Sequence, residues 1–196
     1  LNRYAWIYLS GITLAIMQPD ARDRLGRFLV DYRRQGGRVA FDSNYRPRLW
    51  SSMQGLSAQG SSAQGSSAQQ AKSVISQFLL LTDLALLTLE DEQTLWGVKT
   101  AEDIIRQHRA TGIPEIVIKQ GANPVVIGTG SDIIDVDVPA VAKIVDTTGA
   151  GDGFNAGYLA ARLQGVSAEA AALQGIRIAA TTLGVRGGIA PRSDVG

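Results

Sequence analysis

The residues with the clearest chemical potential form one glycine-rich segment, Asp-Thr-Thr-Gly-Ala-Gly-Asp-Gly-Phe at 146–154. A short apolar run at 141–145 precedes it, and residues 154–163 place apolar side chains at helical spacing, which predicts a turn between a strand and a helix. Glycines relax the backbone of such a turn, and the first N–H groups of a helix have no intrahelical acceptor. The segment therefore has the features of a binding site for an anion such as phosphate.

Asp152 lies in this turn, where its carboxylate would repel a bound phosphate. One interpretation gives it a chemical task, which is to accept the proton of a substrate hydroxyl that attacks a phosphoryl group. A second interpretation is helix capping, because Asp is favoured near helix N-termini. A dinucleotide-binding turn is disfavoured because Phe154 occupies the position of the last glycine in the G-x-G-x-x-G pattern, and Glu169, about 20 residues on, falls in a helical pattern.

The longer segment 146–157, which continues with Asn-Ala-Gly, resembles the C-terminal signature of the ribokinase-like, or pfkB-type, carbohydrate kinases. The resemblance implies that the amides of Gly149, Ala150 and Gly151 form the anion hole for the transferred phosphate. It also implies that Asp152 is the catalytic base and contacts the substrate. The first of the interpretations drawn from residue types alone assigns the same roles.

Composition restricts the other classes of function. The 196 residues include 19 basic and 18 acidic side chains and no cysteine, so neither a nucleic-acid-binding charge excess nor a disulfide framework is indicated. Apolar runs such as 84–89 are too short to span a membrane, and no signal peptide is recognisable. We expect a cytoplasmic protein whose partners are small molecules, not nucleic acid or membranes, with a homo-oligomer as one option.

Alternating strand and helix patterns predict the fold. Apolar segments at 5–11 and 38–42 flank a helical pattern at 19–34, and strand, helix, strand is the unit of a parallel sheet. The remaining patterns predict helices at 71–81 and 101–111, strands at 83–89 and 115–119, a hairpin at 125–138 and a helix capped by Ser167. The expected fold class is α/β, a three-layer (αβα) ribokinase-like fold with a mostly parallel sheet in a single domain over 1–196.

Residues 51–70 have a different character from the rest of the chain. Gly-Ser-Ser-Ala-Gln occurs at 60–64 and again at 65–69. A stretch this polar and small-sided cannot build a core, so it is interpreted as a flexible insert or a weak surface helix. Kinases of the resembled family have an ordinary helix-rich segment here, and the repeat is a departure from their pattern.

Polar side chains follow the strand predicted at 38–42. Open parallel sheets bind ligands beyond the carboxyl ends of their strands, so Asn44 and Arg46 could hold an anion or a sugar hydroxyl, and a solvated turn is the alternative. Asp-x-Asn-x-Arg with the Pro-Arg-Leu-Trp that follows is similar to the pattern of the 2-keto-3-deoxygluconate kinases in the family. This similarity implies that Asn44 and Arg46 bind ATP and that Arg46 also faces the sugar acid. Trp50, at the end of the run, is interpreted as a packing residue.

Two further segments resemble nucleotide-site elements of the family. Lys-Gln-Gly-Ala at 119–122 is similar to a Lys-x-Gly-Ala turn, which implies that Lys119 and Gly121 bind ATP. Leu-Glu-Asp-Glu at 89–92 is similar to an Asn-x-x-Glu element that acts through water on magnesium, which implies a metal-directed role for Glu92 although a leucine replaces the asparagine. Three acidic residues at a predicted helix start are also explained by the helix dipole.

His108, the only histidine, is predicted on the exposed side of its helix. The sequence as a whole predicts a kinase that uses ATP and Mg²⁺ to phosphorylate a primary hydroxyl of a sugar acid, with 2-keto-3-deoxygluconate converted to its 6-phosphate. Another sugar kinase of the family, of fructokinase or ribokinase type, and a catalytically silent nucleotide-binding fragment are the alternatives. The resemblance also implies an N-terminal half and a β-sheet lid with no counterpart here, so a partial fold is expected.

Overall fold

The structure is a computed structural model that describes residues 4–52 and 61–189. Where the sequence predicted one domain, the contacts divide the chain into two compact units, unit 1 (Leu1–Ile118) and unit 2 (Lys119–Gly196). The strands are β1 (Trp6–Ser10), β2 (Arg38–Asp42), β3 (Leu84–Thr88), β4 (Glu115–Gln120), β5 (Asn123–Thr129) and β6 (Asp132–Val136). The helices are α1 (Gly11–Ile16), α2 (Pro19–Arg34), α3 (Pro47–Ser52), α4 (Ser61–Leu79), α5 (Leu89–Trp96), α6 (Ala101–Arg109), α7 (Ala150–Leu163) and α8 (Ala168–Leu183).

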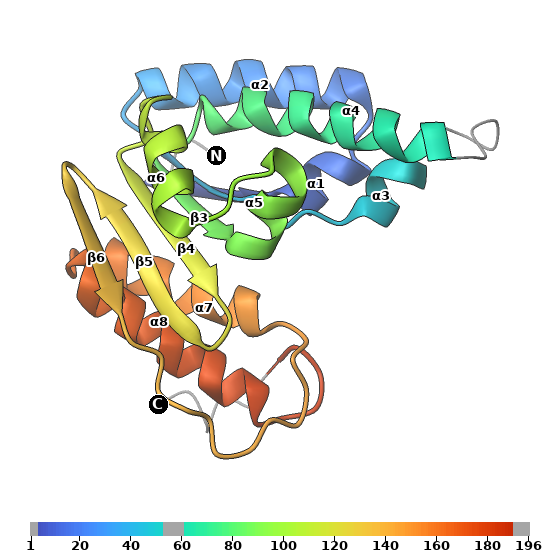
Figure 1. The fold of residues 1–196 in the computed structure, drawn as a ribbon. Helices are drawn as coiled ribbons and strands as arrows, with labels where there is room; N and C mark the ends of the chain where they lie inside the picture. Colours follow the sequence, from blue (N-terminus) through green and yellow to red (C-terminus); the bar gives the residue numbers. More distant parts are fainter. Residues whose placement is uncertain (1–3, 53–60, 190–196) are drawn as a thin grey trace. The chain divides into compact units, whose positions relative to one another are not determined.

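The six strands lie in one sheet in chain order, β1-β2-β3-β4-β5-β6 (Figure 1). β1 pairs with β2 and β2 with β3 in parallel, which places Phe41 beside Leu9 on one neighbour and beside Ala85 on the other. β5 and β6 form the predicted antiparallel hairpin. Because the parallel strands follow in one direction, right-handed crossovers place α2 and α4 on the same face of the sheet. The mostly parallel sheet expected from the sequence is confirmed.

α2 has the bounds that the sequence predicted, with Pro19 in its first turn. α1 was not predicted, since residues 5–11 were expected to be a strand and no helix was expected before residue 19. The chain enters this helix at Gly11, where a Cβ atom would lie 2.0 Å from the carbonyl oxygen of Ser43. Only a glycine allows the start of α1 to approach the end of β2 this closely.

Trp50 is fully buried, which confirms its interpretation as a packing residue. The guanidinium of Arg22 lies 5.4 Å from the centre of the Trp50 ring, and Arg22 Nε donates a hydrogen bond of 2.7 Å to the carbonyl oxygen of Leu14. A buried guanidinium therefore joins α1, α2 and α3 behind the loop that follows β2.

Part of the low-complexity stretch is ordered. Residues 61–70 form the first half of α4, which agrees with the helix alternative, while 53–60 lie outside the described residues and the flexibility of the insert stays a prediction. The second half of the helix buries Ala71, Ile75 and Phe78. The buried face of the second half stabilises α4. Because a helix that is already nucleated extends at low cost, the serine- and glutamine-rich residues 61–70 can continue it toward the N-terminus.

In unit 2, α7 and α8 pack with their backbones close together. A Cβ atom on Gly157 would lie 2.9 Å from the carbonyl oxygen of Gln174, and one on Gly175 would lie 2.8 Å from that of Phe154. The N-terminus of α8 is capped by Ser167, whose hydroxyl accepts the N–H of Ala170 at 3.3 Å, as predicted. The two helices thus provide a rigid support for the segment that enters α7.

The predicted strand at 141–145 is absent from the structure, which assigns no regular element to these described residues. The backbone N–H groups of Val145 and Asp146 both donate to the carbonyl oxygen of Leu183, at 2.8 and 3.3 Å. The side chains of Ile144 and Val145 are exposed. The segment is held by the last turn of α8 instead of by a strand ladder, a partner that its apolar sequence does not reveal.

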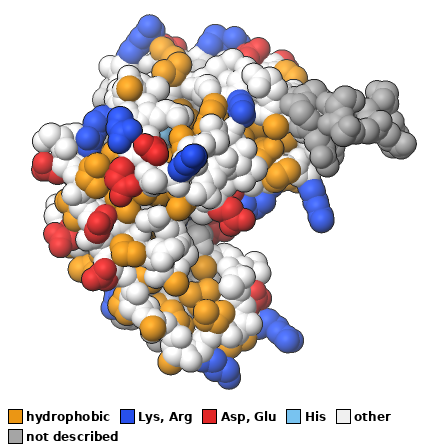
Figure 2. Space-filling model, viewed as in Figure 1, with side chains coloured by type: hydrophobic (Ala, Val, Ile, Leu, Met, Phe, Trp, Pro, Cys, Tyr) orange, Lys and Arg blue, Asp and Glu red, His pale blue; other side chains and the backbone are white. Residues whose placement is uncertain are grey.

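Acidic and basic side chains are interspersed on the face shown in Figure 2, in keeping with the nearly balanced composition. Across the described ranges, none of the helices has the length and apolar character needed to cross a membrane.

Candidate active site

The glycine-rich turn leads directly into α7. Gly149 occupies the N-cap position with a left-handed backbone, at a φ of 76°. The bond from Gly153 N to Gly149 O, at 2.7 Å, spans four residues and opens the intrahelical ladder, so the amides of Ala150, Gly151 and Asp152 precede that ladder. Ala150 N makes only a long turn contact of 3.4 Å to Thr147 O. The helix dipole and these amides favour an anion at this end of α7.

Asp146 holds the turn in shape. Its Oδ1 accepts the backbone N–H of Thr148 at 2.9 Å, and its Oδ2 accepts that of Gly187, also at 2.9 Å. A Cβ atom on Gly149 would lie 2.7 Å from Gly188 Cα, so the turn at 187–188 rests directly against the glycine-rich turn. The hydrogen bonds from Thr148 and then Gly187 lower the pKa of the Asp146 carboxyl below its ordinary value of 3.8.

We expect the hydrogen bonds from Thr148 and Gly187 to Asp146 to weaken only at acidic pH. Since the pKa of Asp146 is lower in the folded chain than in the unfolded chain, its stabilising contribution is present above pH 3.8 and is lost as the pH falls through the folded value. NMR titration should show the amide protons of Thr148 and Gly187 shifting together with one midpoint below pH 3.8. Asp146→Asn should remove that shared midpoint, and separate midpoints for the two amides would contradict the link.

Asp152 lies in the first turn of α7 with an exposed side chain. The N-cap position belongs to Gly149, so Asp152 is not the capping residue that one interpretation required. Its place beside the turn amides is compatible with a base that meets a substrate hydroxyl at the bound phosphate. This role stays a prediction.

Lys119 reaches the same turn from the end of β4. Its side chain is buried, and its Nζ donates a hydrogen bond of 2.9 Å to Oδ1 of Asn155 in α7. A Cβ atom on Gly151 would lie 4.0 Å from the same Nζ. Gly121 follows at the β4 to β5 turn with a φ of 65° and no neighbouring atom within 4 Å of the position of a Cβ atom. The structure therefore brings Lys119 to the glycine-rich turn, whereas Gly121 marks an open turn.

In unit 1, Asn44 follows β2 in an uncommon backbone conformation. Its φ is 28°, a positive value that Asn tolerates better than most residues. Its N–H donates to Asp42 Oδ1 at 3.1 Å. Asn44 Oδ1 and Ser43 Oγ are buried, and neither finds a hydrogen-bond partner among the described residues. An unpaired buried carbonyl oxygen is costly, which makes the Asn44 side chain a candidate ligand contact.

Arg46 extends from the same loop with 55% of its side chain exposed. Its Nη1 donates to Tyr45 O at 3.1 Å and lies 3.7 Å from Asp91 Oδ1 in α5. Asp91 Oδ2 accepts the backbone N–H of Tyr45 at 3.1 Å. One carboxylate of α5 therefore supports the loop that carries Asn44 and Arg46, a role that the sequence did not reveal.

Glu92, for which the resemblance implied a metal-directed role, lies on the inner side of α5. Its side chain is fully buried, and Oε2 is 2.7 Å from Nε2 of His108 in α6. The prediction that His108 is exposed is wrong, because only 3% of its side chain is accessible. The rings of His108 and Trp96 meet in an edge-on arrangement. Oε2 of Glu92 thus has a partner inside unit 1, whereas its buried Oε1 finds none among the described residues, and the metal-directed role stays a prediction.

We predict that Glu92→Ala lowers the free energy of unfolding by about 2–4 kcal/mol, because the buried ring nitrogen of His108 loses its partner. Glu90→Ala is the matched control, since Glu90 is an exposed residue of the same helical turn and should cost less than about 1 kcal/mol. Urea unfolding of the two variants measures the difference. Equal costs would contradict the buried pair.

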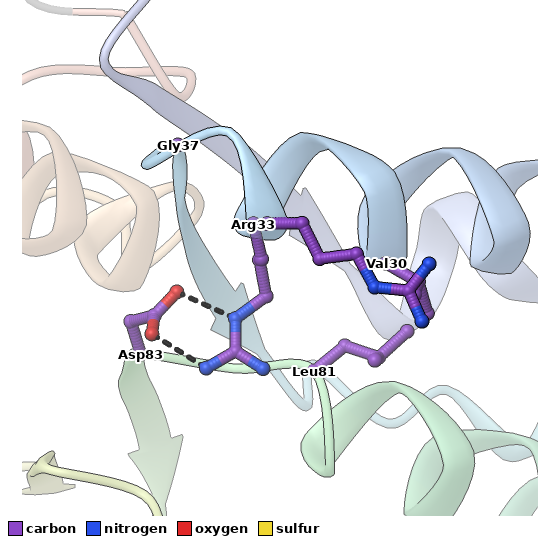
Figure 3. A pocket seen from close by; sticks show the side chains of 6 residues that line it. Val30, Arg33, Gly37, Leu81 and Asp83 are labelled. Atoms are coloured by element: carbon purple, nitrogen blue, oxygen red, sulfur yellow. Dashed lines mark hydrogen bonds and ion pairs between the residues drawn. The ribbon is translucent and has the colours of Figure 1, made fainter.

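A shallow pocket of unit 1 lies at the amino ends of β2 and β3 (Figure 3), the opposite ends to those that carry Asn44 and Arg46. Arg33 and Asp83 meet in it through two hydrogen bonds of 2.8 and 3.1 Å, and Asp83 Oδ2 also accepts the N–H of Val39 at 2.8 Å. The ion pair between Arg33 and Asp83 joins α2 to the sheet. Because these two charged groups bind each other, we do not regard the pocket as a candidate active site.

Comparison with known proteins adds an independent result. The family described as pfkB family carbohydrate kinase matches residues 1–194. The 2-dehydro-3-deoxygluconokinases of Escherichia coli (strain K12) and Dickeya dadantii (strain 3937) are 43% and 40% identical over 98% and 97% of this chain. The chain spans 58% of the length of each of these relatives.

Solved structures give the same fold. Fructokinase from Vibrio cholerae O395, in its fructose, ADP and calcium ion bound form, has a TM-score of 0.74 at 24% identity, and the match covers 97% of this chain and 59% of the fructokinase chain. Aminoimidazole riboside kinase from Salmonella enterica, complexed with aminoimidazole riboside and an ATP analog, has a TM-score of 0.73 at 23% identity, covering 97% and 62%. These similarities confirm the predicted fold class, a three-layer α/β ribokinase-like fold. The chain corresponds to only part of the fold in each solved structure.

Proposed function

Because the chain belongs to the pfkB family of carbohydrate kinases, we propose that it carries the phosphoryl-transfer centre of an ATP-dependent sugar-acid kinase. The observation that carries this proposal is the turn before α7, where first-turn amides, the Lys119 ammonium and the Asp152 carboxylate lie on one helix N-terminus. The names of the relatives at 43% and 40% identity support 2-keto-3-deoxygluconate, converted to its 6-phosphate, as the substrate.

In the proposed reaction, Asp152 accepts the proton of the primary hydroxyl as the hydroxyl oxygen attacks the γ-phosphorus of ATP. The bond between that phosphorus and the bridging oxygen breaks, and ADP leaves with the electron pair. The amides of Gly149, Ala150 and Gly151 stabilise the charge on the transferred group. The turn and the exposed carboxylate thus have separate tasks, one electrostatic and one in proton transfer.

The other ATP-binding roles are those that the sequence predicted. Asn44 and Arg46 are proposed ATP contacts, and so are Lys119 and Gly121. The exposed guanidinium of Arg46 suits the planar carboxylate of a sugar acid, to which it can donate two parallel hydrogen bonds. The cytoplasm, where ATP is abundant, is the proposed compartment.

Magnesium supplies charge neutralisation of the nucleotide phosphates when it is bound. Over the described ranges, no three His, Cys, Asp or Glu side chains gather as metal ligands. Mg²⁺ in nucleotide sites commonly keeps several waters and takes its other ligands from the phosphates. It therefore does not need a cluster of protein carboxylates and can arrive bound to the nucleotide. The metal-directed role of Glu92 stays a prediction, and Oε2 of this residue is buried against His108.

Calorimetric titration of the chain with a non-hydrolysable ATP analogue and Mg²⁺, in the presence and absence of 2-keto-3-deoxygluconate, tests the proposal. We expect nucleotide binding, and we expect Arg46→Ala to weaken it about 10-fold, as for loss of a charge-assisted contact. Arg27→Ala is the control, because Arg27 is exposed on α2.

The outcomes separate the alternatives. Binding of fructose or ribose in place of the sugar acid would favour another sugar kinase of the family. Binding of nucleotide without any sugar would favour a nucleotide-binding fragment, an alternative supported by the 58% span of the relatives. Absence of nucleotide binding at millimolar concentration would reject the proposed site in this chain.

A further inference from the structure

Gly153 lies in the first turn of α7, immediately after Asp152, and its Cα faces Thr182 of α8. A Cβ atom on Gly153 would lie 2.7 Å from Oγ1 of Thr182, which is closer than atoms pack in a protein interior. The same Cβ atom would lie 3.6 Å from the carbonyl oxygen of Ile178, an ordinary contact distance. The Thr182 hydroxyl therefore occupies the space that a side chain at position 153 would need.

The Thr182 hydroxyl is fixed in this place. Thr182 is 3% exposed, and its Oγ1 donates a hydrogen bond of 3.0 Å to the carbonyl oxygen of Ile178 in the preceding turn of α8. A branched side chain on a helix has few rotamers, and another rotamer would take this bond from a buried hydroxyl. The atom that faces Gly153 can therefore not turn aside at low cost.

The contact with Thr182 also determines where Asp152 points. Successive residues of a helix point about 100° apart, so a turn that presents Gly153 to α8 directs the preceding side chain away from α8. The exposed side chain of Asp152 agrees with this direction. Because Gly153 N also opens the intrahelical ladder at Gly149 O, a rotation of this turn would move the carboxylate and the free amides of the turn together.

We propose that Thr182 is a positioning residue, which sets the direction of the Asp152 carboxylate through its contact with Gly153. The inference rests on the proposed function and deepens it, because it adds a residue of α8 that acts on the proton acceptor without touching the substrate. One partner in this contact is a side chain. A second substitution can therefore remove the overlap that a first one creates, which makes the role testable by rescue.

Gly153→Ala should lower kcat for phosphoryl transfer to 2-keto-3-deoxygluconate roughly 10- to 100-fold, as for a small misplacement of a catalytic group. Its midpoint of urea unfolding should change much less, because alanine forms helices better than glycine and offsets part of the overlap. Adding Thr182→Ala should restore most of the lost kcat, since the new Cβ atom then has room. In NMR spectra, the amide resonances of Asp152 should shift in Gly153→Ala and return in the double variant.

Thr181→Ala is the matched control for the rescue. Thr181 Oγ1 makes the same kind of bond, to the carbonyl oxygen of Arg177 at 3.1 Å, but the residue is only half-buried. Thr181→Ala should therefore not restore the kcat of Gly153→Ala. If Gly153→Ala does not fold, Thr182→Ala and Thr182→Ser give the test beside the natural glycine, because only the variant without the hydroxyl should lose kcat.

The outcomes distinguish the positioning role from the proposed function. An unchanged kcat in Gly153→Ala, or a rescue by Thr181→Ala as complete as that by Thr182→Ala, would overturn the positioning role. Equal kcat values for Thr182→Ala and Thr182→Ser would also overturn it. Absence of turnover in the unchanged chain would overturn the proposed function instead, and the amide resonances of Asp152 would still decide whether Thr182 positions this residue.

Discussion

Asp152→Asn is expected to lower kcat for phosphoryl transfer to 2-keto-3-deoxygluconate about 10²- to 10⁴-fold, the range for loss of a general base. The amide keeps the shape of the side chain but has no affinity for the proton of the hydroxyl. Binding of the ATP analogue should be unchanged or tighter, because the exposed carboxylate at the N-terminus of α7 no longer repels the phosphate.

Steady-state release of ADP measures the turnover, and calorimetry measures the binding, which does not depend on turnover. Asp137→Asn removes an exposed carboxylate elsewhere in unit 2 and serves as the control. Equal kcat values for Asp152→Asn and the unchanged chain would exclude Asp152 as the base. Weaker nucleotide binding in the variant would point to a structural role for the carboxylate.

Gly149→Ala should have the second large effect, on both nucleotide binding and stability. A left-handed backbone costs a residue with a side chain about 1–2 kcal/mol. The new Cβ atom would also lie 2.7 Å from Gly188 Cα and 2.8 Å from Gly188 O, which are backbone atoms. To relieve this overlap, either the glycine-rich turn or the turn at 187–188 must move, which should lower the free energy of unfolding by about 1–3 kcal/mol, as for an overpacked contact. The movement would also separate the amides at the start of α7 from the turn that supports them.

Gly165→Ala distinguishes the cost of a left-handed backbone from the cost of the steric overlap with Gly188. Gly165 also has a positive φ, of 78°, but no atom lies within 4 Å of its Cβ position. It should cost only about 1–2 kcal/mol of stability and leave nucleotide binding intact. Thermal unfolding and calorimetry of both variants give the comparison. If the two substitutions have the same effect, the contact between Gly149 and Gly188 has no role in the site.

Local sequence signals were sufficient for the bounds of α2 and for the start of α8. Pro19 and the two glycines after α2 set the bounds of that helix, and Ser167 set the start of α8, because these signals act within a few residues. The segment at 141–145 was misassigned because its backbone partner, Leu183, lies in α8 and leaves no local signal. A short apolar run indicates that a segment tends to be buried or to form a strand. It does not indicate whether another strand lies beside it to complete a sheet.

At Gly149, Ala150, Gly151 and Asp152, the contiguous motif predicted the turn into a helix that the structure has, while the roles of these residues stay predictions. The burial of Glu92 was not foreseen, and the reason is geometric. Successive residues of a helix point about 100° apart, so a shift of one residue exchanges the side chain that faces the loop, Asp91, for one that faces the core. The partner of Glu92 is His108, sixteen positions away in α6. Asn155, a buried polar residue that accepts a hydrogen bond from Lys119, was also missed, although it is followed and preceded by apolar residues in the helical pattern.

The bridge from Asp146 to Gly187 has a consequence for how the protein is made. The ribosome releases the glycine-rich turn about forty residues before the segment that braces it. Nascent chains that end before Gly187 would contain α7 and α8 in full, but the Asp146 carboxylate would lack one of its two amide donors. In the proposed site, the glycine-rich turn therefore becomes able to hold a phosphate only after Gly187 has been synthesised and has donated its N–H to Asp146.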